Sequence, residues 1–138
     1  MMTNKITVEA TIDGELQKIW RFWTQPDHIV KWNFATDDWC CAKAENDLRV
    51  GGKMFARMEA KNGSLGFDFE GVYDEVIDQE KITYTLLDGR GSTTIFENLG
   101  DHIKVSTTFD AEQNTSIEMQ REGWQAILNN FKKYVESN

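Results

Sequence analysis

The sequence predicts an α+β fold in which a curved antiparallel sheet of seven strands wraps around a long C-terminal helix, with two short helices after the first strand. Two observations lead to this prediction. Seven extended segments rich in aromatic and β-branched residues are separated by short turns, and an apolar stripe at helical spacing runs through residues 117–135. A curved sheet has to cover its concave face, and only the terminal helix is long enough to do so. Such an arrangement tends to leave a cavity between sheet and helix.

The first strand is predicted over residues 5–12, where apolar and polar residues alternate in KITVEATI. Apolar residues then recur at helical spacing over residues 16–23, which predicts a short helix that begins near an Asp13 cap. Trp20 and Trp23 belong to this pattern. We interpret them as core residues, because helical spacing alone explains both.

A second short helix is predicted from Pro26 onward. Proline suits the first helical turn, where its missing N–H costs nothing, and Asp27 at this position is favoured by the helix dipole. Ile29 and Trp32 give this helix an apolar edge.

Six more strands are predicted from Trp39 onward, joined mostly by hairpins into an antiparallel meander. Their joints contain Gly51-Gly52, Asn62-Gly63, Asp88-Gly89 and Gly100-Asp101, which are typical of tight turns. We interpret Gly51-Gly52 as a two-residue hairpin with positive φ rather than a phosphate loop, because the phosphate-loop motif and its helix are missing. The predicted strands are residues 39–45, 53–61, 66–78, 81–87, 92–100 and 102–110.

The last and longest helix is predicted to begin with a capping box of Thr115 and Glu118 and to run for about five turns. Arg121 lies on its apolar stripe, where an acidic partner such as Glu70 or Glu97 would satisfy it. The stripe consists of Ile117, Arg121, Trp124, Leu128, Phe131 and Val135.

Gly123 lies inside this helix, where it costs about 1 kcal/mol relative to alanine. Two explanations stay open. The helix could approach the sheet closely at this point, or a ligand could need the space beside Trp124.

Composition excludes several classes of partner. Fifteen Lys and Arg against 23 Asp and Glu give a net charge of -8, so the surface field should repel nucleic acid. No apolar run reaches the ~18–20 residues of a membrane span, and the first ten residues lack the features of a secretory signal. We therefore expect a cytoplasmic protein without stable membrane insertion, in which residues 1–138 form one domain.

Signatures of catalysis are scarce. His28 and His102 fit neither a metal-ligand nor a nucleophile spacing, and we interpret both as solvated. The adjacent cysteines 40–41 would form a bridge only through a strained ring, so they are expected to be inert thiols. Asp68 and Glu70 share one strand face and are expected to be exposed, because unpaired acids are costly to bury. The sequence thus offers no catalytic residue, metal site or cofactor motif, and a non-enzymatic role is favoured.

Several motifs, taken in order, resemble a known family. They are Thr24-x-Pro26-Asp27 with Trp32, Asp47-x-Arg49-x-Gly51-Gly52, Gly71-x-Tyr73-x-Glu75-Val76, Glu80-Lys81-Ile82 with Tyr84-Thr85, and Gly123-Trp124. Over residues 5–135 the chain is similar to the activator of heat-shock protein 90 ATPase homologue-like domains. These belong to the START-like or SRPBCC superfamily of polyketide cyclase and lipid transport proteins, which has the helix-grip (START/Bet v 1-like) fold. Asn33 and Phe34 depart from the family pattern of a second tryptophan followed by Gly-Pro, which puts the shape of a pocket mouth here in question.

The resemblance implies a hydrophobic cavity between the sheet and the last helix, which the superfamily uses for lipids, steroids, polyketides and other apolar small molecules. The fold predicts a binding cavity but does not identify the ligand. Two other classes stay open: a protein-interaction module acting on a chaperone, for which the family name is the evidence, and a cyclase- or hydrolase-type enzyme. An apolar edge around Phe34 and Trp39 would also permit a homodimer.

The candidate ligand-binding residues are side chains that we expect to face this cavity. Aromatic residues on one face of residues 66–78 would meet the last helix, and polar groups among them would orient a ligand. A bulge, for which Gly71 is a plausible site, would reverse these assignments. A solid core is the alternative, because 16 aromatic side chains of about 150–250 Å² each could fill the interior. The predicted set is Trp32, Trp39, Phe55, Phe67, Phe69, Tyr73, Tyr84, Gln120, Trp124 and Leu128.

Overall fold

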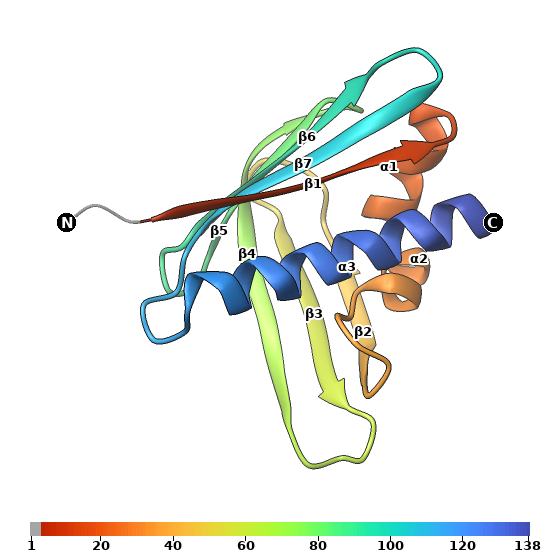
Figure 1. The fold of residues 1–138 in the computed structure, drawn as a ribbon. Helices are drawn as coiled ribbons and strands as arrows, with labels where there is room; N and C mark the ends of the chain where they lie inside the picture. Colours follow the sequence, from red (N-terminus) through yellow and green to blue (C-terminus); the bar gives the residue numbers. More distant parts are fainter. Residues whose placement is uncertain (1–3) are drawn as a thin grey trace.

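The computed structural model describes residues 4–138, which form one seven-stranded antiparallel sheet and three helices. The sheet curls around α3 (Ile117–Ser137), while α1 (Leu16–Thr24) and α2 (Pro26–Trp32) lie near the C-terminal half of α3 (Figure 1). The predicted helix-grip architecture is therefore confirmed. The strands are β1 (Lys5–Asp13), β2 (Trp39–Asn46), β3 (Lys53–Ala60), β4 (Gly66–Ile77), β5 (Lys81–Leu86), β6 (Gly91–Asn98) and β7 (His102–Asp110).

The strands follow one another as a meander from β2 to β7, and β1 completes the sheet beside β7 in the order β1-β7-β6-β5-β4-β3-β2. The segment with α1 and α2 carries the chain from one edge of the sheet to the other. Helix α3 runs along edge strand β1, where Gln125 Nε2 donates to the Glu9 carbonyl (3.0 Å) and the Asp13 N–H donates to Glu136 Oε2 (3.0 Å). These bonds satisfy backbone groups that an edge strand would otherwise leave unpaired.

The sheet bends at two register shifts, one between Cys41 and Lys43 and one between Tyr73 and Glu75. Gly71, where the sequence favours a bulge, keeps the regular register. Its backbone lies so close to β5 that an added Cβ would be 2.9 Å from the Thr85 carbonyl oxygen. Because the shift comes after Tyr73, the aromatic residues before it stay on one face of β4.

The connection from β2 to β3 differs from the predicted two-residue hairpin, since it spans residues 47–52. Only Gly51 has a positive φ, of 84°. The Gly51 N–H donates to the Tyr73 carbonyl (2.8 Å), and the Tyr73 N–H donates to the Gly52 carbonyl (3.0 Å). Gly52 is required for another reason, because a Cβ there would lie 2.0 Å from the Asp47 carbonyl oxygen. The two glycines thus serve a left-handed turn and a close backbone approach.

The start of α1 also differs from its prediction. Asp13 is the last residue of β1 rather than a helix cap. The N-cap position is Glu15, whose side chain makes no capping bond. The apolar spacing of the helix is nevertheless confirmed, since Ile19 and Trp20 are buried.

Helix α3 begins one residue later than the predicted capping box. Its N-cap is Ser116, whose Oγ accepts from the Met119 N–H (3.1 Å), so Thr115 is not the cap. Glu118 instead accepts from Arg121 Nη1 (2.6 Å). Arg121 is therefore an exposed member of a helix-surface ion pair and has no partner in the sheet.

The close-packed core lies at the C-terminal half of α3. Phe131 is 0% exposed and meets Trp23 and Trp32 edge-on, with ring centroids 4.9 and 4.7 Å apart. Trp20 and Val135 are buried beside them. Along residues 4–138, no helix combines the length and apolar character needed to cross a membrane.

Candidate functional site

A cavity of about 330 Å³ lies between the sheet and α3, with α2 at one side. Its volume is at the lower end of the range of about 300–1,000 Å³ typical of small-molecule sites. The alternative of a solid core is therefore wrong. Eight of the ten predicted residues line the cavity, namely Trp32, Phe55, Phe67, Phe69, Tyr73, Tyr84, Trp124 and Leu128.

Aromatic rings form the walls and meet mainly edge to face. The ring centroid of Phe69 lies 6.2 Å from that of Tyr84, with an interplanar angle of 88°, and 6.3 Å from that of Trp124, with an angle of 68°. The centroids of Tyr73 and Tyr84 are 6.4 Å apart, and their planes meet at 80°. Trp124 stacks closely on Phe109, at 3.9 Å and 12°. One face of the indole is thus covered by the sheet, while the residue still borders the cavity.

The rim of the cavity lies near the start of β4. Phe67 is 50% exposed and contacts Trp39 at a centroid distance of 5.9 Å. Trp39 itself lies outside the cavity lining, and Phe67 is the lining residue that its ring meets. Phe34 and Trp39 are both half-buried and pack against a small cluster around Met58.

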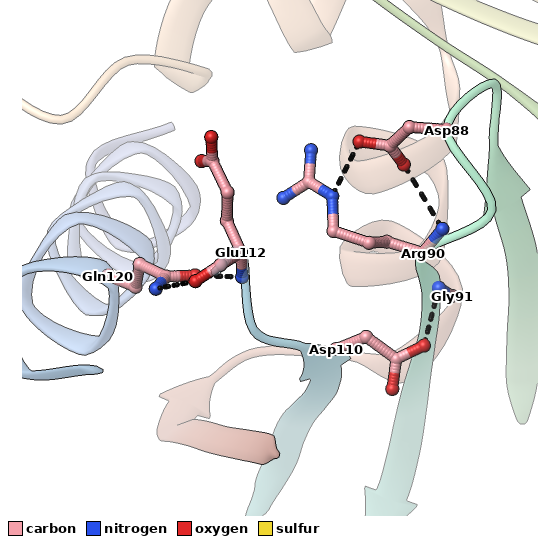
Figure 2. A network of polar contacts seen from close by, with 6 residues as sticks. All are labelled: Asp88, Arg90, Gly91, Asp110, Glu112 and Gln120. Atoms are coloured by element: carbon pink, nitrogen blue, oxygen red, sulfur yellow. Dashed lines mark hydrogen bonds and ion pairs between the residues drawn. The ribbon is translucent and has the colours of Figure 1, made fainter. Parts of the chain in front are cut away.

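Gln120 is the second predicted residue outside the cavity lining. Its Oε1 accepts from the Glu112 N–H (2.7 Å), and its Nε2 donates to the carbonyls of Glu112 (2.9 Å) and Thr115 (2.8 Å). The buried amide therefore holds the link between β7 and α3 in place (Figure 2). The amide oxygen and nitrogen of Gln120 are both hydrogen-bonded to the backbone rather than directed at a ligand.

Three charged residues that the sequence did not indicate line the cavity: Arg90 before β6, Glu112 after β7, and Glu45 of β2, which pairs with Lys43 at 3.2 Å. Asp88 holds Arg90 by two bonds, since it accepts from the backbone N–H (3.1 Å) and from Nε (2.7 Å). Asp110 accepts from the Gly91 N–H (2.8 Å), as Figure 2 shows. The only signal in the sequence was the Asp88-Gly89 turn, which places a charged residue directly before a strand.

Hydrogen bonds lower the pKa of both aspartates in this network. The bond from the Arg90 N–H is the main cause at Asp88. At Asp110 the main cause is the bond from Lys5 Nζ, followed by the one from the Gly91 N–H. Both carboxylates are therefore ionised at neutral pH and act as acceptors.

Another part of the lining contains Asn46, a residue of β2. Its Oδ1 accepts from the Tyr73 hydroxyl, and its Nδ2 donates to the Thr24 carbonyl at 2.6 Å. Asn46 thus ties β2 to β4 and to the end of α1. These bonds fix this part of the cavity wall and use both the oxygen and the nitrogen of the amide.

The polar groups deeper in the cavity are neutral. Burial raises the pKa of Tyr84 to about 12 and also raises the pKa of Tyr73, so both phenols stay protonated at physiological pH. Thr94 and Thr107 line the cavity as a hydroxyl pair, with their oxygens 2.8 Å apart. The Ser92 hydroxyl is buried on β6, opposite Tyr84 of β5.

The two histidines lie away from the cavity lining. His28 stacks on Phe22 at 4.1 Å, and its Nδ1 lies 2.8 Å from the Tyr134 hydroxyl. The interpretation of His28 as solvated is therefore wrong, because the ring is a packed part of the helix layer. His102 is exposed and lies 3.2 Å from Asp13 Oδ1.

Comparison with known proteins gives a consistent result. The model of the Activator of Hsp90 ATPase homolog 1-like protein family matches residues 13–136, whereas no curated protein matches the chain. The solution structure of the AHSA1-like protein from Aeromonas hydrophila is 40% identical, with a TM-score of 0.91, over 97% of this chain and 93% of that one. A protein from Cytophaga hutchinsonii is 46% identical, with a TM-score of 0.84 and the same coverage. A Chromobacterium violaceum protein, at 24% identity and a TM-score of 0.87 over 98% and 99% of the two chains, shares the fold.

Proposed function

The chain belongs to the Activator of Hsp90 ATPase homolog 1-like protein family, and we propose that it binds an apolar small molecule, such as a lipid, a polyketide or an aromatic compound, in the cavity. The observation that carries the proposal is the space of about 330 Å³ with mainly aromatic and aliphatic walls. An apolar guest would remove both its own surface and the walls from water, at about 25 cal/mol per Å² of buried apolar area.

The packing around the cavity favours binding without large rearrangement. The core around Phe131 is closely packed and anchors the C-terminal half of α3. The stack of Trp124 on Phe109 fixes the helix nearer its N-terminal end. Because packing within the protein itself forms both anchors, little conformational entropy has to be lost on binding.

The interior offers a guest few charges and a small number of neutral hydrogen-bonding groups. Tyr84 stays a neutral phenol, and the hydroxyls of Thr94 and Thr107 already bond to each other. A guest with an apolar body therefore matches the deeper part of the cavity. A role on a chaperone rests on family membership alone, which is why small-molecule binding is the function that we favour.

A cavity-narrowing variant tests the proposal. The purified protein is titrated with N-phenyl-1-naphthylamine, a neutral apolar probe whose emission rises on burial. Ile127 lines the cavity from α3, and Ile127→Phe adds bulk there, so we expect the affinity for the probe to fall by about tenfold or more.

The matched control is Ile95→Phe, the same change at a 47%-exposed position on β6 outside the lining. The control should bind the probe like the unmodified protein. Equal probe binding by all three proteins would show that the cavity is not the binding site. Native mass spectrometry of the protein as purified adds a second measurement, namely the mass of any small molecule retained.

A further inference from the structure

The cavity has a charged end that its apolar walls do not explain. Arg90 and Glu112 both line it, and Figure 2 shows their side chains reaching into the space between the turn before β6 and the link after β7. Within residues 4–138, Nη1 and Nη2 of Arg90 and both carboxylate oxygens of Glu112 have no hydrogen-bond partner, and the two charges form no ion pair with each other.

The backbone on both sides of this end is held firmly. Asp88 accepts from both the N–H and Nε of Arg90, at 3.1 and 2.7 Å. Gln120 binds the N–H and the carbonyl of Glu112, at 2.7 and 2.9 Å. The bases of both side chains are therefore fixed, while the charged tips of half-buried Arg90 and exposed Glu112 lie at this end of the cavity. Such an arrangement lowers the loss of side-chain conformational entropy when a ligand binds.

The balance of charge decides which guest fits. Asp88 pairs with Arg90, and Asp110 pairs with Lys5 Nζ at 2.6 Å, so a simple anion bound to Arg90 would be repelled by the carboxylate of Glu112, which is unpaired within residues 4–138. A simple cation would be attracted by Glu112 but repelled by Arg90. A zwitterionic group can accept two hydrogen bonds from the Arg90 guanidinium and donate hydrogen bonds to the Glu112 carboxylate. Both sets are charge-assisted hydrogen bonds, which are stronger than neutral ones.

We propose that this end of the cavity binds the zwitterionic head of an amphipathic guest, with an α-amino-acid head joined to an apolar body. The carboxylate of the head binds Nη1 and Nη2 of Arg90, and its ammonium group binds Glu112. The apolar body lies along the aromatic wall that begins at Tyr84, which is near enough to Arg90 for that charge to offset part of the rise in the tyrosine pKa caused by burial. The inference rests on the proposed function and names the class of guest.

Three ligands with the same phenylbutyl body test the inference: 2-amino-5-phenylpentanoic acid, 5-phenylpentanoic acid and 4-phenylbutylamine. Their affinities are measured by isothermal titration calorimetry. The zwitterion should bind at least about tenfold more tightly than either singly charged ligand. In Arg90→Gln the zwitterion should bind no more tightly than the amine, because the partner of its carboxylate is lost. In Glu112→Gln the zwitterion should bind no more tightly than the acid, because the partner of its ammonium group is lost.

Matched controls are Arg121→Gln and Glu118→Gln, which remove the same charges from an exposed pair on α3 and should keep the preference for the zwitterion. Unchanged binding of N-phenyl-1-naphthylamine shows that each variant cavity is intact. If the probe binds in the cavity but the three ligands bind equally, or if the Arg90 and Glu112 variants keep the preference, this inference is wrong and the proposed function stands. If neither probe nor ligands bind, both are overturned.

Discussion

Replacement of Trp124 by alanine measures how much of its indole is packed. Burying a whole tryptophan in a closed core contributes about 3–5 kcal/mol relative to alanine. In the structure, one face of the ring stacks on Phe109 at 3.9 Å, while its nearest other aromatic neighbour, Phe69, is 6.3 Å away across the cavity wall. The stacked pair adds about 0.5–1.5 kcal/mol beyond the buried area. We therefore expect Trp124→Ala to lower the free energy of unfolding by about 2 kcal/mol, since only one face is covered.

The comparison variant is Phe131→Ala. Phe131 is 0% exposed and packs against Trp23 and Trp32, so the full loss of about 3–5 kcal/mol is expected there. Both variants are unfolded in urea and followed by far-UV circular dichroism. Their free energies of unfolding are compared with that of the unmodified protein, provided that the slope of the free energy against urea concentration (the m-value) is unchanged. If Trp124→Ala costs as much as Phe131→Ala, the indole is packed on both faces and the hollow beside it does not exist.

Two further predictions concern the helix glycine and the buried phenols. Gly123→Ala should raise the free energy of unfolding by about 0.5–1 kcal/mol in the same urea titration, because a Cβ at this position meets no atom within 4 Å; a loss would show that the space is needed. Burial raises the pKa of Tyr84 to about 12 and raises that of Tyr73 above the ordinary value of about 10, so their stabilising contribution is complete below about pH 10 and is lost as the pH rises through the folded pKa. Absorbance at 295 nm should therefore reach its full tyrosinate amplitude only together with alkaline unfolding, and full amplitude in a protein with native circular dichroism would contradict the burial.

The strands were predictable because two independent signals agree. Alternation with period two shows which face of each strand is buried, and the Gly-containing pairs mark the turns. Gly63, Gly89 and Gly100 all have positive φ, which explains why glycine is present at those joints. The strand predicted over residues 66–78 therefore differs from β4 (Gly66–Ile77) by one residue.

Helix starts and the longer loop were harder to predict, because neighbouring residues offer equivalent chemistry. Thr115 and Ser116 both carry a hydroxyl that can cap a helix, and the choice of Ser116 is made by the backbone geometry. The need for glycine at position 52 arises from the Asp47 carbonyl, whose approach follows from the path of the whole loop. Neither cause leaves a periodic pattern in the sequence.

Strand parity also predicted most of the cavity wall, since Phe67, Phe69 and Tyr73 share one face of β4. It failed for two residues for different reasons. Trp39 is the first residue of edge strand β2, where its side chain packs outside the lining. A polar residue among apolar ones on a helix predicts a ligand-orienting group at Gln120, but its amide oxygen and nitrogen bond to the backbone between β7 and α3.

The charged end of the cavity was missed because parity describes residues within strands, whereas Arg90 and Glu112 lie just outside them. The hairpin itself contains the missing information. The Gly100 turn sets the register of β6 against β7, and Ser92 pairs with Phe109. Continued outward by two residues, this register places Arg90 opposite residue 111 and next to Glu112, on the side of the hairpin far from its turn. Extending each predicted hairpin past its open end therefore identifies pairs of side chains that can meet at a cavity mouth, and in this chain it identifies a guanidinium and a carboxylate.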